Sequence, residues 1–155
     1  MTGQGKSTFI KQFIDGKNCF VFDVQNEYLL STNPNESRSK DISLDEKRFV
    51  EMCKRKRNTV IVFEEATGFF EGKLDKEVRR IILSKRHTQN TLVFCFHSIS
   101  SVPPRLMQFT NYVILFKTLD EPYQVEGKFP TLYPYFVKVR SMQHQQYLNI
   151  KTIPQ

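Results

Sequence analysis

The first eight residues contain a run whose residue types could bind a phosphate group. It consists of Thr2, Gly3, Gln4, Gly5, Lys6, Ser7 and Thr8. A complete phosphate loop has the pattern G-x-x-x-x-G-K-[ST], in which backbone amides surround the phosphates at the N-terminus of a helix. In that pattern Lys6 would bridge the β- and γ-phosphates, and Ser7 would offer its hydroxyl to Mg²⁺. The run therefore predicts a site for a nucleotide phosphate.

The pattern requires another glycine five residues before Gly5, and that position precedes Met1. The strand that aims such a loop at its helix would precede Met1 as well. We therefore expect the chain to lack its first strand, through truncation or a start site assigned too late. A polypeptide that begins at Met1 is expected to bind phosphate poorly. A chance glycine-rich N-terminus is the alternative, and the amphipathic pattern that follows argues against it.

Two adjacent carboxylates, Glu64 and Glu65, follow an apolar strand predicted over 59–63. Ligands of open α/β sheets bind beyond the carboxyl ends of the strands. Because neighbouring residues on a strand point to opposite sides, we expect Glu64 to face Mg²⁺ and Glu65 to act as general base toward an attacking water. The alternative is that the two acids form only a solvated strand end. Their combination with the phosphate loop favours the functional interpretation.

His97 directly follows another apolar strand, predicted over 91–96. A polar residue at the end of a strand beside the phosphate loop can sense the γ-phosphate, so His97 is a candidate catalytic residue. A histidine that is merely exposed, or satisfied by a local partner, is an equally good interpretation. Cys19, Cys53 and Cys95 match no metal-ligand spacing, and we expect buried, reduced thiols in a cytoplasmic protein.

Hydrophobic periodicity predicts alternating helices and strands. Helices are predicted over 7–14, 43–58, 74–85 and 134–142, with a short one after Pro104. Strands are predicted over 19–24, 59–63, 91–96, 112–116 and 147–150, and a surface loop over 25–40. Inward positions on the helices are expected at Phe9, Ile10, Phe13, Ile14, Phe49, Val50, Cys53, Val78, Ile81 and Ile82. Unbroken apolar strands separated by helices indicate an α/β fold with a parallel sheet covered on both faces.

Composition restricts the class of protein. The 155 residues are of ordinary length for one domain, 1–155, within which 119–155 forms a C-terminal tail. With 39% hydrophobic residues the chain can build a core, and no apolar run is long enough to suggest a membrane-spanning helix. A net charge of +7 makes an anionic partner plausible without choosing between nucleotide, nucleic acid and membrane surface.

Taken in order, these features resemble the additional-strand P-loop ATPases, and more narrowly the FtsK/HerA superfamily of DNA-pumping motors. That group includes viral genome-packaging ATPases and the ATPase domain of phage zonular-occludens-toxin-like proteins. The narrower resemblance rests on the T-G-Q-G-K-S-T loop, the double-acid strand, the basic 84–87 segment before the fourth strand, and 21–28, which is similar to the "hhhDxxxEY" second strand of HerA-like proteins. It covers Met1 to about Lys117.

The resemblance implies a three-layer P-loop fold with a mainly parallel sheet of order 5-1-4-3-2, whose first strand is missing from this chain. It implies Mg²⁺-dependent ATP hydrolysis that drives DNA translocation or packaging in a virus or phage, by a homo-oligomeric ring in the host cytoplasm. An arginine finger would cross the subunit interface, with Arg86 the first candidate and Arg80 the second. Glu64 stands where the family usually has Asp, and His97 where it usually has Gln.

Other interpretations stay open. The basic run 54–57 could contact a DNA backbone without sequence preference, or it could simply favour the dipole at a helix C-terminus. A small P-loop kinase is the rival enzyme, although its arginine-rich lid is represented in 99–109 only by Arg105. The rival without catalysis is an interaction or membrane-associated module whose nucleotide site has decayed.

Overall fold

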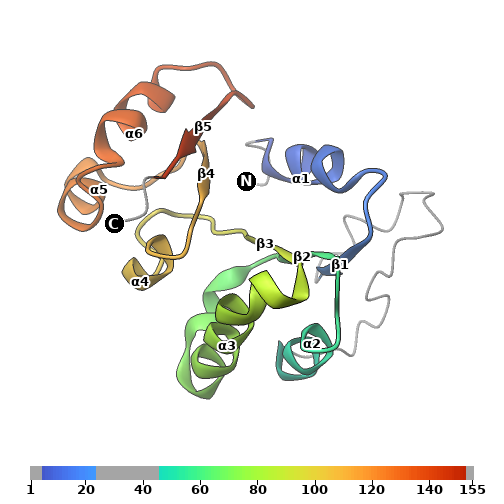
Figure 1. Cartoon of the computed structure of the whole chain (residues 1–155). Helices are drawn as coiled ribbons and strands as arrows, with labels where there is room; N and C mark the ends of the chain where they lie inside the picture. The colour runs from blue at the N-terminus through green and yellow to red at the C-terminus, as the bar shows by residue number, and fades with distance from the viewer. Residues whose placement is uncertain (1–4, 24–45, 153–155) are drawn as a thin grey trace. The chain divides into compact units, whose positions relative to one another are not determined.

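The computed structural model describes residues 5–23 and 46–152, apart from the side chains of Lys73 and Leu74. These residues form two compact units. The three-strand unit comprises the described part of Ile10–Phe96, and the two-strand unit comprises the described parts of Met1–Phe9 and His97–Gln155. The first helix, α1 (Lys6–Ile14), contributes to both units (Figure 1). The expected loop over 25–40 and the first residues, 43–45, of the helix predicted over 43–58 lie outside the described residues.

Strands β1 (Cys19–Phe22), β2 (Val60–Phe63) and β3 (Thr91–Phe94) build the first unit. They are parallel and lie in the order β1-β2-β3, with Cys19 opposite Val60 and Val60 opposite Thr91. Every residue of β1 and β2 is buried, as expected for apolar strands covered on both faces. The predicted parallel α/β sheet is confirmed for these strands.

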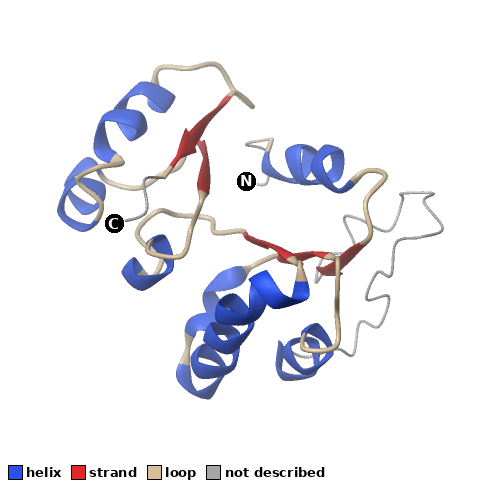
Figure 2. Ribbon diagram, viewed as in Figure 1, coloured by secondary structure: helices blue, strands red, loops and turns tan. Residues whose placement is uncertain are grey.

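Helices α2 (Glu46–Cys53) and α3 (Gly72–Thr88) lie against one face of this sheet (Figure 2). The short 3₁₀-helix η1 (Ala66–Phe70), which the sequence did not predict, joins β2 to α3. The C-terminal half of α1 lies on the other face and buries Ile10 and Ile14. The predicted inward residues of the two other helices are also buried: Phe49, Val50, Cys53, Val78, Ile81 and Ile82.

Several predicted boundaries are wrong. The helix expected to reach Asn58 ends at Cys53, because tight turns bonded from Arg55 N to Met52 O and from Lys56 N to Cys53 O replace helical geometry. Asn58, with φ 52°, then turns the chain into β2. In contrast, α3 continues to Thr88 and ends where Gln89 adopts the left-handed conformation. The strand predicted to reach Phe96 ends at Phe94, although Cys95 N still donates to Phe63 O.

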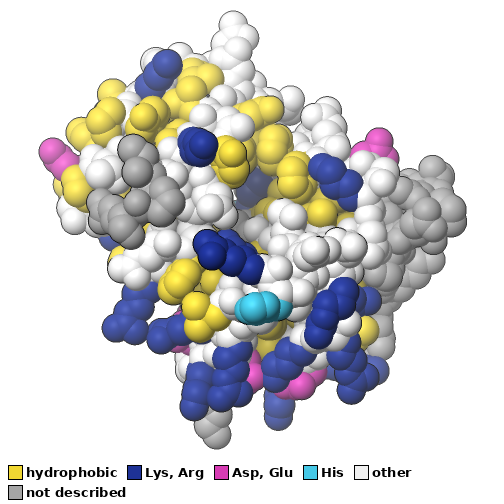
Figure 3. Space-filling view, in the orientation of Figure 1, with side chains coloured by type: hydrophobic (Ala, Val, Ile, Leu, Met, Phe, Trp, Pro, Cys, Tyr) yellow, Lys and Arg dark blue, Asp and Glu magenta, His cyan; other side chains and the backbone are white. Residues whose placement is uncertain are grey.

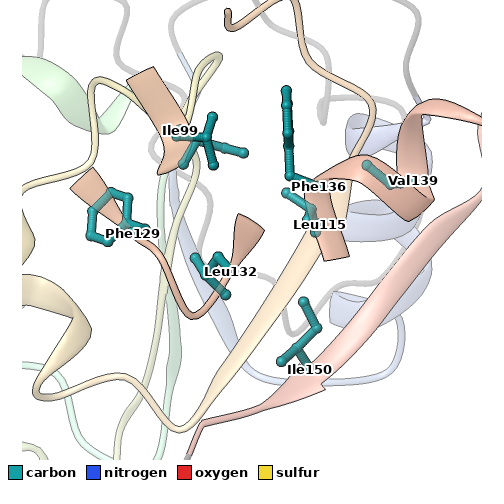
Figure 4. Packing of buried hydrophobic residues seen from close by; sticks show 8 residues of the cluster. Ile99, Leu115, Phe129, Leu132, Phe136, Val139 and Ile150 are labelled. Carbon is teal, nitrogen blue, oxygen red and sulfur yellow. The ribbon is translucent and has the colours of Figure 1, made fainter. Parts of the chain in front are cut away.

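The two-strand unit is built on β4 (Tyr112–Phe116) and β5 (Tyr147–Lys151), which pair antiparallel. Its helices are α4 (Pro104–Met107), α5 (Pro122–Lys128) and α6 (Tyr133–Arg140), of which α5 was not predicted. Their core is shown in Figure 4 and consists of Ile99, Leu115, Val125, Phe129, Leu132, Phe136, Val139 and Ile150. The tail over 119–155 therefore supplies most residues of this hydrophobic core and is an integral part of the unit.

Candidate functional site

The N-terminus of α1 has the local geometry expected at the end of a phosphate loop. Gly5 has φ 82°, in the left-handed region, and Lys6 is the first residue of the helix. Phe9 N donates to Gly5 O at 2.9 Å, so Ser7 and Thr8 lie in the first helical turn. The amides of a first turn lie at the positive end of the helix dipole, which favours anions. Thr2, Gly3 and Gln4 lie outside the described residues.

The fold brings Lys6 to His97. Lys6 Nζ lies 3.5 Å from His97 Nδ1, although the residues are 91 positions apart. An ammonium group can only donate, so the imidazole can accept at Nδ1 only when that nitrogen carries no proton. His97 is exposed and lies in the loop that follows β3, which ends at Phe94. Two of the predicted site residues are therefore neighbours in the same unit.

Aromatic packing and a close backbone contact hold the start of α1 in place. The ring of Phe9 packs edge-on against Tyr147, at 5.0 Å between centroids, and against Phe116, at 6.1 Å. A Cβ added to Gly5 would lie 3.0 Å from Gln145 Cβ and 3.1 Å from Gln145 Cα. A turn between α6 and β5 therefore touches the glycine that precedes Lys6.

Glu64 and Glu65 lie at the carboxyl end of β2, in the three-strand unit. Glu64 is buried, and Glu65 has φ 55° and ψ 50°, a left-handed conformation that reverses the chain into η1. Ala66 N donates to Cys95 O at 2.9 Å and ties this turn to the end of the β3 segment. The expectation of alternating strand side chains is wrong here, because β2 ends at Phe63 and the acids occupy a turn. Their separate roles stay predictions.

The predicted site residues are thus divided between the units. Lys6, Ser7, Thr8 and His97 belong to the two-strand unit, and Glu64, Glu65 and Arg86 belong to the three-strand unit. Arg86 is exposed in the last turn of α3. Arg80 donates to Glu77 on the same helix at 3.3 Å, which favours a structural role for this second candidate.

The basic run 54–57 has structural partners that its sequence did not reveal. Lys54 Nζ lies 2.8 Å from Glu51 and 2.6 Å from Glu77 of α3, and the hydrogen bonds that it donates to these carboxylates raise the pKa of Lys54. Lys56 Nζ lies 4.4 Å from the centroid of the Phe20 ring. Arg57 donates hydrogen bonds to the backbone carbonyls of Lys54 and Lys56. These contacts favour the structural interpretation of the run. Figure 3 shows Lys and Arg side chains gathered over the region where α2 and α3 lie.

One buried acid that is not among the predicted site residues lies in the tail over 119–155. Asp120, directly before the N-cap of α5, accepts hydrogen bonds from the amides of Ile99 and Ser100. Its partners are about twenty positions away, so no local spacing could have revealed them. A single acid between an apolar strand and a helix is the only signal in the sequence.

Ser7 and Glu64 are the residues that the sequence predicts as magnesium ligands. The described part of the chain holds no group of three or more His, Cys, Asp or Glu that could bind a metal. Magnesium in nucleotide sites typically takes one or two protein ligands and completes its shell with phosphates and water. Ser7 belongs to the two-strand unit and Glu64 to the three-strand unit, so their joint role at such an ion stays a prediction.

Cys19, Cys53 and Cys95 are buried, as expected. Burial raises the pKa of the Cys53 thiol well above its usual range. Among the described helices, none has the length and apolar character needed to cross a membrane. Comparisons of the chain with protein-family models, with curated proteins and with solved structures find no match.

Proposed function

We propose that the chain is a Mg²⁺-dependent ATPase of the P-loop type, similar to the DNA-pumping FtsK/HerA motors. One observation carries the proposal: left-handed Gly5 leads directly into α1, and Lys6 in its first turn lies 3.5 Å from His97. A glycine, a helix start and a lysine in this order are what a phosphate loop needs in order to surround and neutralise an anion.

In the proposed fold β1, β2 and β3 correspond to the second, third and fourth strands of a 5-1-4-3-2 sheet, and β4 to the fifth. The observed order β1-β2-β3 supports this assignment, because the proposed order places those strands side by side. The incomplete burial of β3 supports this assignment as well. Leu92, Val93 and Phe94 are apolar but only half-buried, and β3 pairs only with β2 among the described strands. A further strand beside β3 would bury them.

In the proposed reaction, the amides before and within the first turn of α1 bind phosphate oxygens, and Lys6 stabilises the charge on the β- and γ-phosphates. Glu65 orients a water molecule and accepts its proton at a carboxylate oxygen as that water attacks the γ-phosphorus. The bond from the γ-phosphorus to the bridging oxygen breaks, and ADP leaves with that oxygen while inorganic phosphate is formed. Magnesium, held by the Ser7 hydroxyl and Glu64, would supply charge neutralisation. Arg86 of a neighbouring subunit would complete the site through its planar, permanently charged group.

His97 is proposed to report whether phosphate is present. The Lys6 ammonium is within reach of His97 Nδ1. A bound phosphate would draw Lys6 toward itself, and it would leave His97 able to donate to the phosphate or to water. The energy of hydrolysis would move DNA in a virus or phage, by a ring of subunits that holds the DNA backbone without sequence preference.

The test is ATP hydrolysis with Mg²⁺ by the purified chain and by a chain extended upstream, each compared with its Lys6→Ala and Glu65→Gln variants. Loss of a general base is expected to lower the rate by about 10²-fold or more. Lys11→Ala and Glu71→Gln are the matched controls, because Lys11 is exposed farther along the same helix and Glu71 is exposed just before α3. Both controls should hydrolyse ATP at the parental rate.

Three results would contradict the proposal. Hydrolysis that is unchanged in Lys6→Ala or in Glu65→Gln would rule out the mechanism. Transfer of labelled γ-phosphate to a small acceptor rather than to water would indicate a kinase. The same absence of a heat of ATP binding by calorimetry in this chain and in a chain extended upstream would indicate an interaction module whose nucleotide site is not functional.

A further inference from the structure

The loop that carries His97 is held by a carboxylate from the tail. Ile99 N donates to Asp120 Oδ2 at 2.8 Å, and Ser100 N donates to Asp120 Oδ1 at 3.0 Å. Both carboxylate oxygens are used, and the side chain of Asp120 is buried. Hydrogen bonds to an ionised acceptor are about twice as strong as neutral ones. The two amides that follow His97 by two and three residues are therefore held firmly.

Other contacts make the same loop compact. Ser101 N donates to Ser98 Oγ at 3.2 Å, and Ser101 Oγ donates to Ser98 O at 2.8 Å. Lys128 of α5 donates through Nζ to Ser100 O. The side chain of Ile99 is buried in the core of the two-strand unit. The loop that follows His97 is therefore held by hydrogen bonds to its backbone and by the buried side chain of Ile99.

Asp120 is not the residue that caps helix α5. Helix α5 is capped by the next residue, Glu121, whose amide donates to Gln124 Oε1. Burial tends to raise the pKa of Asp120, but hydrogen bonds from Ser100, Thr118 and Ile99 outweigh it and leave that pKa lowered. The carboxylate is therefore charged at neutral pH and able to bind both amides.

We propose that Asp120 is a positioning residue that holds the loop after β3 so that His97 stays opposite Lys6. This gives the C-terminal tail a function at the candidate phosphate site. The catalytic consequence rests on the proposed ATPase function, whereas the effect on the position of His97 does not. Movement of a catalytic group by about 1 Å can lower a rate by about 10²-fold.

The test uses Asp120→Asn, which keeps the size of the side chain and removes one acceptor and the charge. The chain has 3 histidines, so their imidazole signals can be followed together by NMR, and His97→Gln identifies the His97 signal. We expect Asp120→Asn to shift the His97 signal and to leave those of His87 and His144 in place. Glu126→Gln, an exposed acid-to-amide change on α5, is the control and should shift none of the three.

A folded Asp120→Asn chain with an unchanged His97 signal would overturn the proposal. If Asp120→Asn does not fold, Lys128→Met provides the second variant, since it removes the donor to Ser100 O; an unchanged His97 signal in that folded variant would also overturn it. In the hydrolysis assay we expect kcat to fall by up to about 10²-fold in Asp120→Asn with little change in KM. A shifted His97 signal in a chain that hydrolyses no ATP would support the positioning role and contradict only the ATPase.

Discussion

At the scale of single residues, Gly5 is a position where the backbone conformation and a neighbouring backbone both disfavour a side chain. Its φ of 82° is strained for any residue with a Cβ, and that Cβ would press on the backbone of Gln145 at 3.1 to 3.2 Å. We expect Gly5→Ala to lower the free energy of unfolding by about 1 to 3 kcal/mol, measured by urea denaturation.

Gly127 provides the control for this change. It lies within α5, and nothing lies within 4 Å of a Cβ added there. Because alanine favours a helix more than glycine does, Gly127→Ala should be neutral or should stabilise the chain by up to about 1 kcal/mol. Equal losses in both variants would show that the contact with Gln145 is not responsible.

Asp120 gives a pH dependence whose sign can be worked out. The pKa of Asp120 is lowered in the folded state, so its stabilisation is fully present above the unfolded-state pKa of about 3.9 and is lost as the pH falls through the lower native pKa. We expect Asp120→Asn to destabilise the chain most near neutral pH, and the difference from the parent to shrink below about pH 4. Urea denaturation at a series of pH values measures this difference.

Glu126→Gln should give a pH profile parallel to that of the parent chain, because this carboxylate is exposed. A difference between Asp120→Asn and the parent that stays constant from neutral to acidic pH would mean that the charge of Asp120 contributes nothing to folding.

At the scale of elements, α2 is attached to the sheet through one aromatic residue. Phe49 is fully buried, and its ring lies 4.7 Å from that of Phe20, 5.1 Å from Phe22, 5.3 Å from Phe63 and 5.7 Å from Phe69. Removal of a buried phenylalanine ring leaves a cavity as well as lost contacts. We expect Phe49→Ala to lower the free energy of unfolding by about 3 to 5 kcal/mol.

Leu83→Ala tests whether burial rather than apolar character causes this loss. Leu83 is 60% exposed on α3, so its replacement should change stability by no more than about 0.5 kcal/mol. Thermal or urea unfolding of both variants gives the comparison. A loss from Leu83→Ala as large as that from Phe49→Ala would contradict the described packing of the helices.

At the scale of the whole molecule, the net charge of +7 is consistent with binding to a polyanion. If the proposed motor holds DNA through its backbone, affinity should fall steeply with salt and should not depend on sequence. Fluorescence anisotropy with two duplexes of equal length and unrelated sequence would measure both properties. A clear preference for one duplex, or an affinity that is insensitive to salt, would contradict binding through the backbone alone.

The sequence alone determined the features that depend on neighbouring residues. Its apolar runs predicted the parallel strands, and helical periodicity identified buried positions such as Phe49 and Val78. It also identified the residues of the candidate site, including Lys6, His97 and the paired acids. Residues three or four apart share a helix face and alternate residues share a strand face, so such patterns can be read locally.

Tertiary structure decided which of these residues meet. Lys6 approaches His97 across 91 positions, and Asp120 binds an amide 21 positions away. The turn at Gln145 contacts Gly5, and the unmatched tail became a core. Local patterns do not encode such contacts, because they depend on the path of the whole chain. The helix predicted over 43–58 is too long for a related reason. After Cys53 the backbone forms turn hydrogen bonds, and Lys54 forms ion pairs with Glu51 and Glu77. Hydrophobic periodicity does not describe such contacts.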